Sequence, residues 1–182
     1  MVKQNVIDDK GFVRTVNRLA HEILERNKGA ETLGIVGIRT RGDLLAQRIA
    51  KNISLMEHIQ IPIGSLDITL YRDDLRGKIN QPLLKTTDIL FDITNRNIIL
   101  VDDVLFTGRT VRSALNALMD IGRPSSIQLA VLVDRGHRQL PIKPDYVGKN
   151  IPTSYSQQIQ VMMTEIDGED AVYLQEKEGG KE

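Results

Sequence analysis

One stretch, residues 98–112, constrains the fold more than any other part of this chain of 182 residues. It begins with the apolar run 98–101, which is typical of a parallel strand that is covered on both faces. Asp102 and Asp103 follow where we expect the strand to end, and in open α/β sheets ligands bind at the carboxyl ends of strands. The polar residues 107–110 then precede a predicted helix, whose free N–H groups and positive dipole end favour a phosphate. The stretch therefore predicts a sugar-phosphate site, in which the carboxylates bind ribose hydroxyls directly or through Mg²⁺.

Alternative interpretations of this stretch are weaker. An Asp-Asp pair alone is common, and it is often a solvated strand end or a helix cap. The chain contains no Gly-x-x-x-x-Gly-Lys-Ser/Thr loop, and no Gly-x-Gly-x-x-Gly fingerprint follows the strand, which argues against P-loop and dinucleotide sites. The full order of strand, two acids, Thr-Gly-x-Thr and helix is much more restrictive than any of its parts.

A second unit with the same order lies earlier in the chain. Residues 33–38 are predicted to be a buried strand and residues 43–52 a helix, with the basic turn Arg39-Thr40-Arg41-Gly42 between them. Such a turn offers N–H groups and guanidinium groups to a diphosphate, although it could also be an ordinary connection with exposed arginines. Because strands and helices alternate over residues 31–133, we expect one α/β domain with a mostly parallel sheet flanked by helices.

Composition narrows the class of protein. The chain has no cysteine, which excludes disulfides and cysteine-based metal sites, and no apolar run approaches the ~20 residues of a membrane helix. The first residues lack the apolar core of a signal peptide, so we expect a cytoplasmic protein. The net charge is zero, but seven of the 24 acidic residues and only two of the 24 basic residues lie from Glu165 onward. A local basic surface on the rest of the chain is therefore possible.

Two further segments are candidates for function. Residues 12–27 have the periodicity of an amphipathic helix, and Arg14, Arg18 and His21 form a stripe on its polar side with Arg26 near its end. From this helix alone, a solvated helix face with Glu22 and Glu25 balancing the charge is the preferred interpretation of the stripe. Residues 72–82 are polar and lack apolar periodicity, which favours a lid over a charged substrate, with Arg72 as its phosphate contact.

Residues 98–110 closely resemble the PRPP-binding motif of type I phosphoribosyltransferases. The resemblance implies the fold of that family, with a flexible lid loop and a small hood, and it makes the turn at residues 39–42 the pyrophosphate loop. It assigns catalytic roles to Asp102, Asp103 and Arg72, with Asp102 and Asp103 also serving Mg²⁺ through ribose and diphosphate. The expected PRPP- and nucleotide-binding residues are Thr40, Arg41, Gly42, Ile98, Ile99, Leu100, Val101, Asp102, Asp103, Val104, Leu105, Phe106, Thr107, Gly108, Arg109 and Thr110.

Residues 67–75, 132–138 and 147–153 extend the likeness to one bifunctional subfamily. Its members convert uracil and PRPP to UMP and diphosphate. They also bind a stem-loop in the leader of pyrimidine-operon mRNA when UMP or UTP is bound, which favours transcription termination, and they form homodimers or higher oligomers. We expect neither DNA nor a membrane as a partner. The alternative is a nucleobase-salvage phosphoribosyltransferase without an RNA function.

The subfamily resemblance also changes the interpretation of two features. Phe106 stands where purine-specific relatives have an acid before Thr-Gly, so no general base is available from this position. Because aromatic residues are only 4% of the chain, we expect RNA recognition by basic side chains rather than by an aromatic platform. The basic positions that the resemblance places on an RNA-facing surface are Arg14, Arg18, His21, Arg26, Arg138, Lys143 and Lys149.

Overall fold

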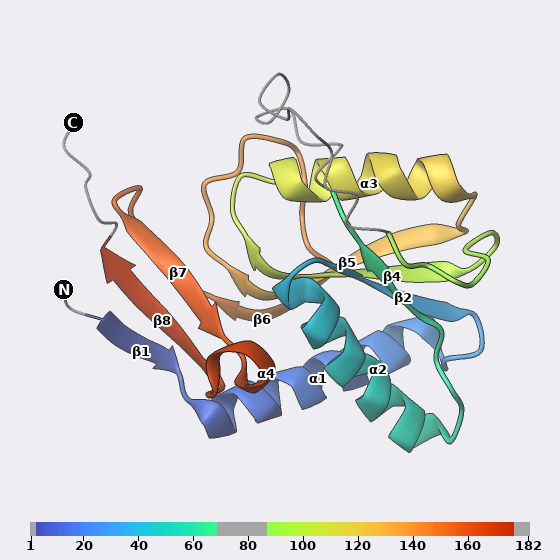
Figure 1. Ribbon diagram of the computed structural model, residues 1–182, viewed down its shortest axis with the longest axis horizontal. Helices are drawn as coiled ribbons and strands as arrows, with labels where there is room; N and C mark the ends of the chain where they lie inside the picture. Colours follow the sequence, from blue (N-terminus) through green and yellow to red (C-terminus); the bar gives the residue numbers. More distant parts are fainter. Residues whose placement is uncertain (1–2, 69–86, 177–182) are drawn as a thin grey trace.

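A parallel sheet of five strands forms the centre of the computed structural model, which describes residues 3–68 and 87–176 (Figure 1). The strand order is β3-β2-β4-β5-β6, and every neighbouring pair in this order is parallel. The strands are β2 (Leu33–Ile38), β3 (Ile63–Leu66), β4 (Asn97–Leu105), β5 (Ser126–Asp134) and β6 (Tyr146–Asn150). The predicted mostly parallel sheet is therefore confirmed.

Helices cover both faces of this sheet (Figure 1). The helices α1 (Asp9–Asn27) and α2 (Arg41–Glu57) lie on one face, and α3 (Arg109–Ile121) lies on the other. Alternate side chains of β4 point to opposite faces of the sheet. Ile99 and Val101 pack with α1 and α2, whereas Ile98 and Leu100 pack with α3. A strand that is buried on both faces has no polar side, which explains its continuous apolar run. None of the helices in the described part of the chain is long and apolar enough to span a membrane.

The first long helix begins and packs as its sequence predicts. Asp8 is its N-cap, and the Asp8 Oδ1 atom accepts a hydrogen bond of 2.7 Å from the Gly11 N–H. Phe12, Leu19 and Ile23 are fully buried, so the apolar stripe faces the sheet and the core. The opposite face of α1 is thereby left at the surface.

A second, smaller sheet lies beside the end of the parallel sheet (Figure 1). Its strands are antiparallel in the order β1 (Lys3–Ile7), β8 (Ala171–Glu176) and β7 (Gln157–Met162), with the short helix α4 (Thr164–Asp167) between β7 and β8. We call β1, β7, α4 and β8 the hood. The predicted lid at residues 72–82, including Arg72, and the end at residues 177–182 lie outside the described residues.

Candidate active site

The strand β4 carries the two acids within the sheet rather than beyond its end. The strand continues to Leu105 because its backbone stays paired with β5 through Asp102, Val104 and Leu105. The expectation that the strand ends before Asp102 is therefore wrong. The loop to α3 begins only at Phe106, so the acids are held by a paired and rigid backbone.

Asp102 and Asp103 form a closely spaced pair of carboxyl groups. The Asp102 Oδ1 atom accepts a hydrogen bond of 2.9 Å from the Asp103 N–H, and the Asp103 Oδ1 atom accepts one of 2.8 Å from the Val104 N–H. Burial and the negative charge of Asp103 raise the pKa of Asp102 well above its usual range. Burial also raises the pKa of Asp103, although the nearby guanidinium of Arg41 opposes this effect. A ligand that supplies a cation or hydroxyl donors would stabilise the ionised form of both carboxyl groups.

The pH dependence of stability tests this electrostatic arrangement. A raised pKa in the folded state means that Asp102 favours folding at low pH, and this contribution is lost as the pH rises through the raised value. Asp102→Asn keeps an oxygen that can accept from the Asp103 N–H but does not titrate. In metal-free buffer we expect the melting temperature of the variant, relative to the original protein, to increase from acidic to mildly alkaline pH. A difference that does not change with pH would contradict this expectation.

The loop from β4 to α3 closes with a glycine. Gly108 is the N-cap of α3 and has a φ of 90°, which a side chain rarely tolerates. The Thr107 carbonyl accepts a hydrogen bond of 3.0 Å from the Gln139 N–H, which ties this loop to the segment after β5. Because Gly108 has no side chain to cap the helix, the predicted phosphate loop at residues 107–110 presents backbone to a ligand at the start of α3.

The first turn of α2 lies directly against the middle of β4. A Cβ atom on Gly42 would lie 2.6 Å from the Val101 carbonyl oxygen and 3.1 Å from the Asp102 Cα atom. Thr40 precedes α2, and the peptide bond between Arg39 and Thr40 is cis. The segment at residues 39–42 therefore lies beside the acidic pair of β4, in agreement with the rule for carboxyl ends of parallel strands.

A third loop, after β5, completes the site. It borders a hollow of about 380 Å³. The Arg138 Nη1 atom donates a hydrogen bond of 2.8 Å to the Phe106 carbonyl, and Arg138 also pairs with Asp134. Its guanidinium thus fastens the loops after β4 and β5 to each other. The hollow is lined by Asp134, Arg135, Gly136, His137, Arg138, Asn150, Pro152 and Thr153.

An aromatic group beside this hollow was not predicted from the sequence. The buried guanidinium of Arg135 lies 4.0 Å from the centre of the Phe106 ring, and the Phe106 and His137 rings are 5.8 Å apart. The Tyr155 ring lies 4.2 Å from His137 and is largely exposed. Tyr155 stands alone in a polar segment, so no periodicity or motif marks it, and only the fold brings it to the site.

Comparisons with known proteins agree with this geometry. Residues 3–166 match the phosphoribosyl transferase domain family. The chain belongs to this family. It is 55% identical over 176 residues to the Bifunctional protein PyrR of Thermoanaerobacter sp., covering 97% of this chain and 99% of the relative. It is also 57% identical to the Bifunctional protein PyrR of Bacillus cereus, covering 96% of this chain and 98% of the relative.

Solved structures support the same fold. A hypoxanthine phosphoribosyltransferase from Staphylococcus aureus superposes with a TM-score of 0.69 at 19% identity, covering 96% of this chain and 93% of that structure. One from Trypanosoma cruzi, in complex with the product IMP, gives a TM-score of 0.64 at 16% identity and covers 83% of this chain and 77% of that structure. At this identity the likeness concerns the fold, and it establishes the type I phosphoribosyltransferase architecture.

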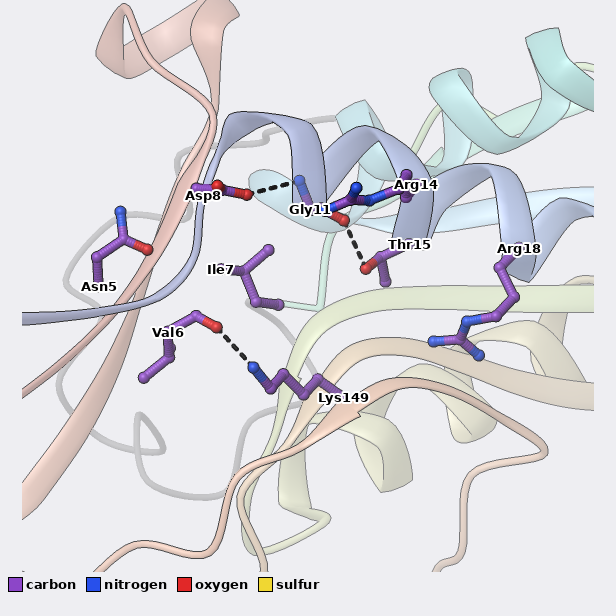
Figure 2. A pocket seen from close by; sticks show the side chains of 9 residues that line it. All are labelled: Asn5, Val6, Ile7, Asp8, Gly11, Arg14, Thr15, Arg18 and Lys149. Atoms are coloured by element: carbon purple, nitrogen blue, oxygen red, sulfur yellow. Dashed lines mark hydrogen bonds between the residues drawn. The ribbon is translucent and has the colours of Figure 1, made fainter.

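Three of the basic residues predicted to face RNA lie together on this phosphoribosyltransferase. Arg14 and Arg18 from α1 and Lys149 from β6 border a hollow of about 540 Å³ (Figure 2). The Lys149 Nζ atom donates a hydrogen bond of 2.7 Å to the Val6 carbonyl, and Arg18 donates to the Gly148 carbonyl and pairs with Glu22 at 2.6 Å. We call this feature the basic hollow; it is lined by Asn5, Val6, Ile7, Asp8, Gly11, Arg14, Thr15, Arg18 and Lys149.

The other four predicted RNA-facing residues do not line the basic hollow. His21 lines a separate groove between α1 and α2. Arg26 forms an ion pair of 2.8 Å with Asp145 next to β6, and Lys143 is exposed in the loop before β6. Arg138 lies at the phosphoribosyltransferase site, as described above. The structure therefore brings three of the seven predicted residues together at one hollow and places the other four elsewhere.

Proposed function

We propose that the protein regulates transcription of a pyrimidine operon by attenuation and also converts uracil and PRPP to UMP and diphosphate. A chain that aligns over nearly its whole length with proteins named Bifunctional protein PyrR carries both a PRPP motif and the basic hollow. This combination in one domain is the observation that carries the proposal. The RNA partner is a stem-loop in the operon's leader mRNA, and the protein binds it when UMP or UTP occupies the nucleotide site.

The enzymatic half of the proposal uses the three loops at the carboxyl ends of the strands. Asp102 and Asp103 bind the ribose hydroxyls, residues 107–110 bind the 5′-phosphate, and residues 40–42 bind the diphosphate. Arg72 contacts the phosphates from the lid. As the C1′–oxygen bond to diphosphate breaks, its electron pair leaves with the diphosphate, while N1 of uracil forms the new bond to C1′ and gives its proton to water.

The residues at the site fit a magnesium ion. Mg²⁺ keeps several waters and is commonly held by one or two carboxylates together with substrate phosphates, and Asp102 and Asp103 supply two adjacent carboxyl groups. No group of three or more acidic or histidine side chains that could hold a metal occurs in residues 3–68 and 87–176, so the phosphates would complete the coordination. The bound ion would neutralise charge on the diphosphate.

Phe106 limits how the reaction can be accelerated. A phenyl ring cannot accept a proton, and here it packs near the guanidinium of Arg135 and the ring of His137. We infer that catalysis depends on the position of PRPP and on charge neutralisation at the diphosphate. A modest rate would follow, which suits a protein whose nucleotide ligand is also a signal.

The regulatory half needs a connection between nucleotide and RNA, and Arg138 supplies a candidate. Its guanidinium binds the Phe106 carbonyl next to the phosphate loop and also binds Asp134. A nucleotide that reshapes the loop after β4 would therefore act on the loop after β5, which leads into β6 and Lys149. We propose that Arg138 affects RNA binding mainly through this connection. The basic residues that contact RNA phosphates are then Arg14, Arg18 and Lys149, with additional contacts from His21, Arg26 and Lys143.

Two experiments separate this proposal from its alternatives. A gel shift with pyrimidine-operon leader RNA that requires UMP or UTP is expected from the bifunctional protein, but not from a salvage enzyme without an RNA function. Formation of UMP from uracil and PRPP with Mg²⁺ then separates the bifunctional protein from a regulator that has lost catalysis. We expect both results, in a cytoplasmic protein that acts as a homodimer or higher oligomer.

Charge reversal tests the RNA surface. Arg18→Glu is expected to weaken UMP-dependent RNA binding about 10-fold or more and to lower the slope of log affinity against log salt by about 1. Because Arg18 also bonds the Gly148 carbonyl, Arg14→Glu serves as a second variant, at an exposed position on the same hollow. Lys51→Glu is the matched control, since Lys51 is exposed on α2 and does not line the basic hollow. Unchanged affinity and salt slope in both arginine variants would contradict the assignment.

A further inference from the structure

An ion pair joins the hood to the proposed pyrophosphate loop. The Arg41 Nη2 atom, in the first turn of α2, lies 3.1 Å from both carboxylate oxygens of Asp167 in α4. Both side chains are largely removed from solvent, with exposed fractions of 30% for Arg41 and 13% for Asp167. A pair that is this well covered is screened less by salt than a surface pair.

Asp167 is itself held firmly. The Met163 N–H donates a hydrogen bond of 2.8 Å to Asp167 Oδ2, and the Asp167 N–H donates one of 2.7 Å to the Met163 carbonyl. The hydrogen bond from Met163, together with the charge of Arg41, lowers the pKa of Asp167, so it is a carboxylate at neutral pH. Asp167 is therefore a fixed anchor for a long and otherwise flexible side chain.

Arg41 also faces the acids of β4. Its positive charge favours the ionised form of Asp103, while its Nη2 atom binds Asp167 of the hood. Its Nε atom is buried and has no hydrogen-bond partner among the described residues. A buried donor without a partner is costly, and an anionic ligand that accepts from it would remove that cost.

We propose that Asp167 is a positioning residue for the diphosphate of PRPP, because it holds Arg41 at one nitrogen and thereby directs the remaining guanidinium N–H groups to the ligand. The inference rests on the proposed function, in which residues 40–42 bind the diphosphate. Pre-organisation of Arg41 lowers the entropic cost of binding this part of the substrate. The hood thus contributes to PRPP affinity without touching PRPP.

A second set of ion pairs between α2 and the hood provides the matched control. Arg48 binds Glu165 and Asp170, with nitrogen–oxygen distances of 2.6 Å for each ion pair. These pairs attach the hood to the middle of α2, on the same helical face as Arg41 but two turns further along the helix. Loss of Asp170 would weaken hood attachment, whereas loss of Asp167 would both weaken attachment and release Arg41.

Steady-state kinetics with uracil, PRPP and Mg²⁺ test the proposal. For Asp167→Asn we expect the KM for PRPP to rise about 10-fold, as for loss of one charge-assisted hydrogen bond, with kcat and the KM for uracil nearly unchanged. Inhibition by diphosphate should weaken by a similar factor. Asp167→Glu should restore part of the affinity, and Asp170→Asn should lower the melting temperature while leaving the KM for PRPP within about 2-fold of the original value.

The outcomes that overturn the proposal are distinct from failure of the proposed function. A KM for PRPP that stays constant or falls in Asp167→Asn would overturn it, as would an equal rise in Asp170→Asn. If the original protein formed no UMP, the proposed function would fail. Calorimetric titration with magnesium diphosphate would then decide the inference alone: weaker binding by Asp167→Asn than by Asp170→Asn supports it, and equal binding overturns it.

Discussion

Replacing Asp103 by asparagine is expected to reduce formation of UMP from uracil and PRPP by about 100-fold or more. Asparagine keeps an oxygen that can accept from the Val104 N–H, so the backbone of β4 should not change. It removes the negative charge that we assign to the ribose hydroxyls and Mg²⁺ of the bound substrate. The measurement is kcat/KM for PRPP at saturating uracil, with the melting temperature as a check on folding.

The control for Asp103→Asn is Glu57→Gln, which removes one exposed carboxylate at the end of α2 and should leave kcat/KM within about 2-fold of the original value. If the kcat/KM of Asp103→Asn for PRPP stayed within about 3-fold of the original value, Asp103 would no longer be a proposed catalytic residue.

Gly42→Ala is expected to lower the free energy of unfolding by about 2–3 kcal/mol and to weaken PRPP binding as well. The added methyl group would lie 2.6 Å from the Val101 carbonyl oxygen and 3.1 Å from the Asp102 Cα atom, and both belong to the backbone of β4. A paired central strand cannot shift as easily as a side chain, so α2 must move away from the site. Urea unfolding measures the first effect and the KM for PRPP the second.

Gly11→Ala is the comparison for this variant. Gly11 also lies in the first turns of a helix, but the atoms that a Cβ would meet there, at 2.8 Å and 3.3 Å, belong to the side chains of Asp8 and Ile7. Those side chains can rotate, so we expect a smaller loss of stability at Gly11. Equal losses in the two variants would show that the contact with β4 is not tight.

The sequence predicted the parts of the site that are contiguous in the chain. A buried strand, a polar loop and a helix follow one another at residues 98–112 and again at residues 33–52, so local patterns are enough to locate both loops. The end of β4 was misplaced because Asp102 and Asp103 read as strand-ending acids. Pairing with β5 keeps them in the strand, and partner strands are not visible in a local pattern.

Contacts between distant segments were not predictable. Arg41 and Asp167 are 126 positions apart, and in the sequence Asp167 is one of several acids near the C-terminus. The same limit applies to the basic residues. Helical periodicity places Arg14 and Arg18 on one face, whereas only the resemblance grouped Lys149 with them, and only the fold gives the guanidinium of Arg138 internal partners. A bonded arginine and a solvated one look alike in a sequence.

The arrangement of the hood sets the order in which a newly made chain can become functional. The middle strand of the hood is β8, which pairs with β1 from the beginning of the described chain and with β7. During synthesis, β1 must therefore wait for residues 171–176, which leave the ribosome after all five strands of the parallel sheet. The residues of the parallel sheet thus leave the ribosome before the hood is complete, and the contact that we propose positions Arg41 for diphosphate belongs to the hood.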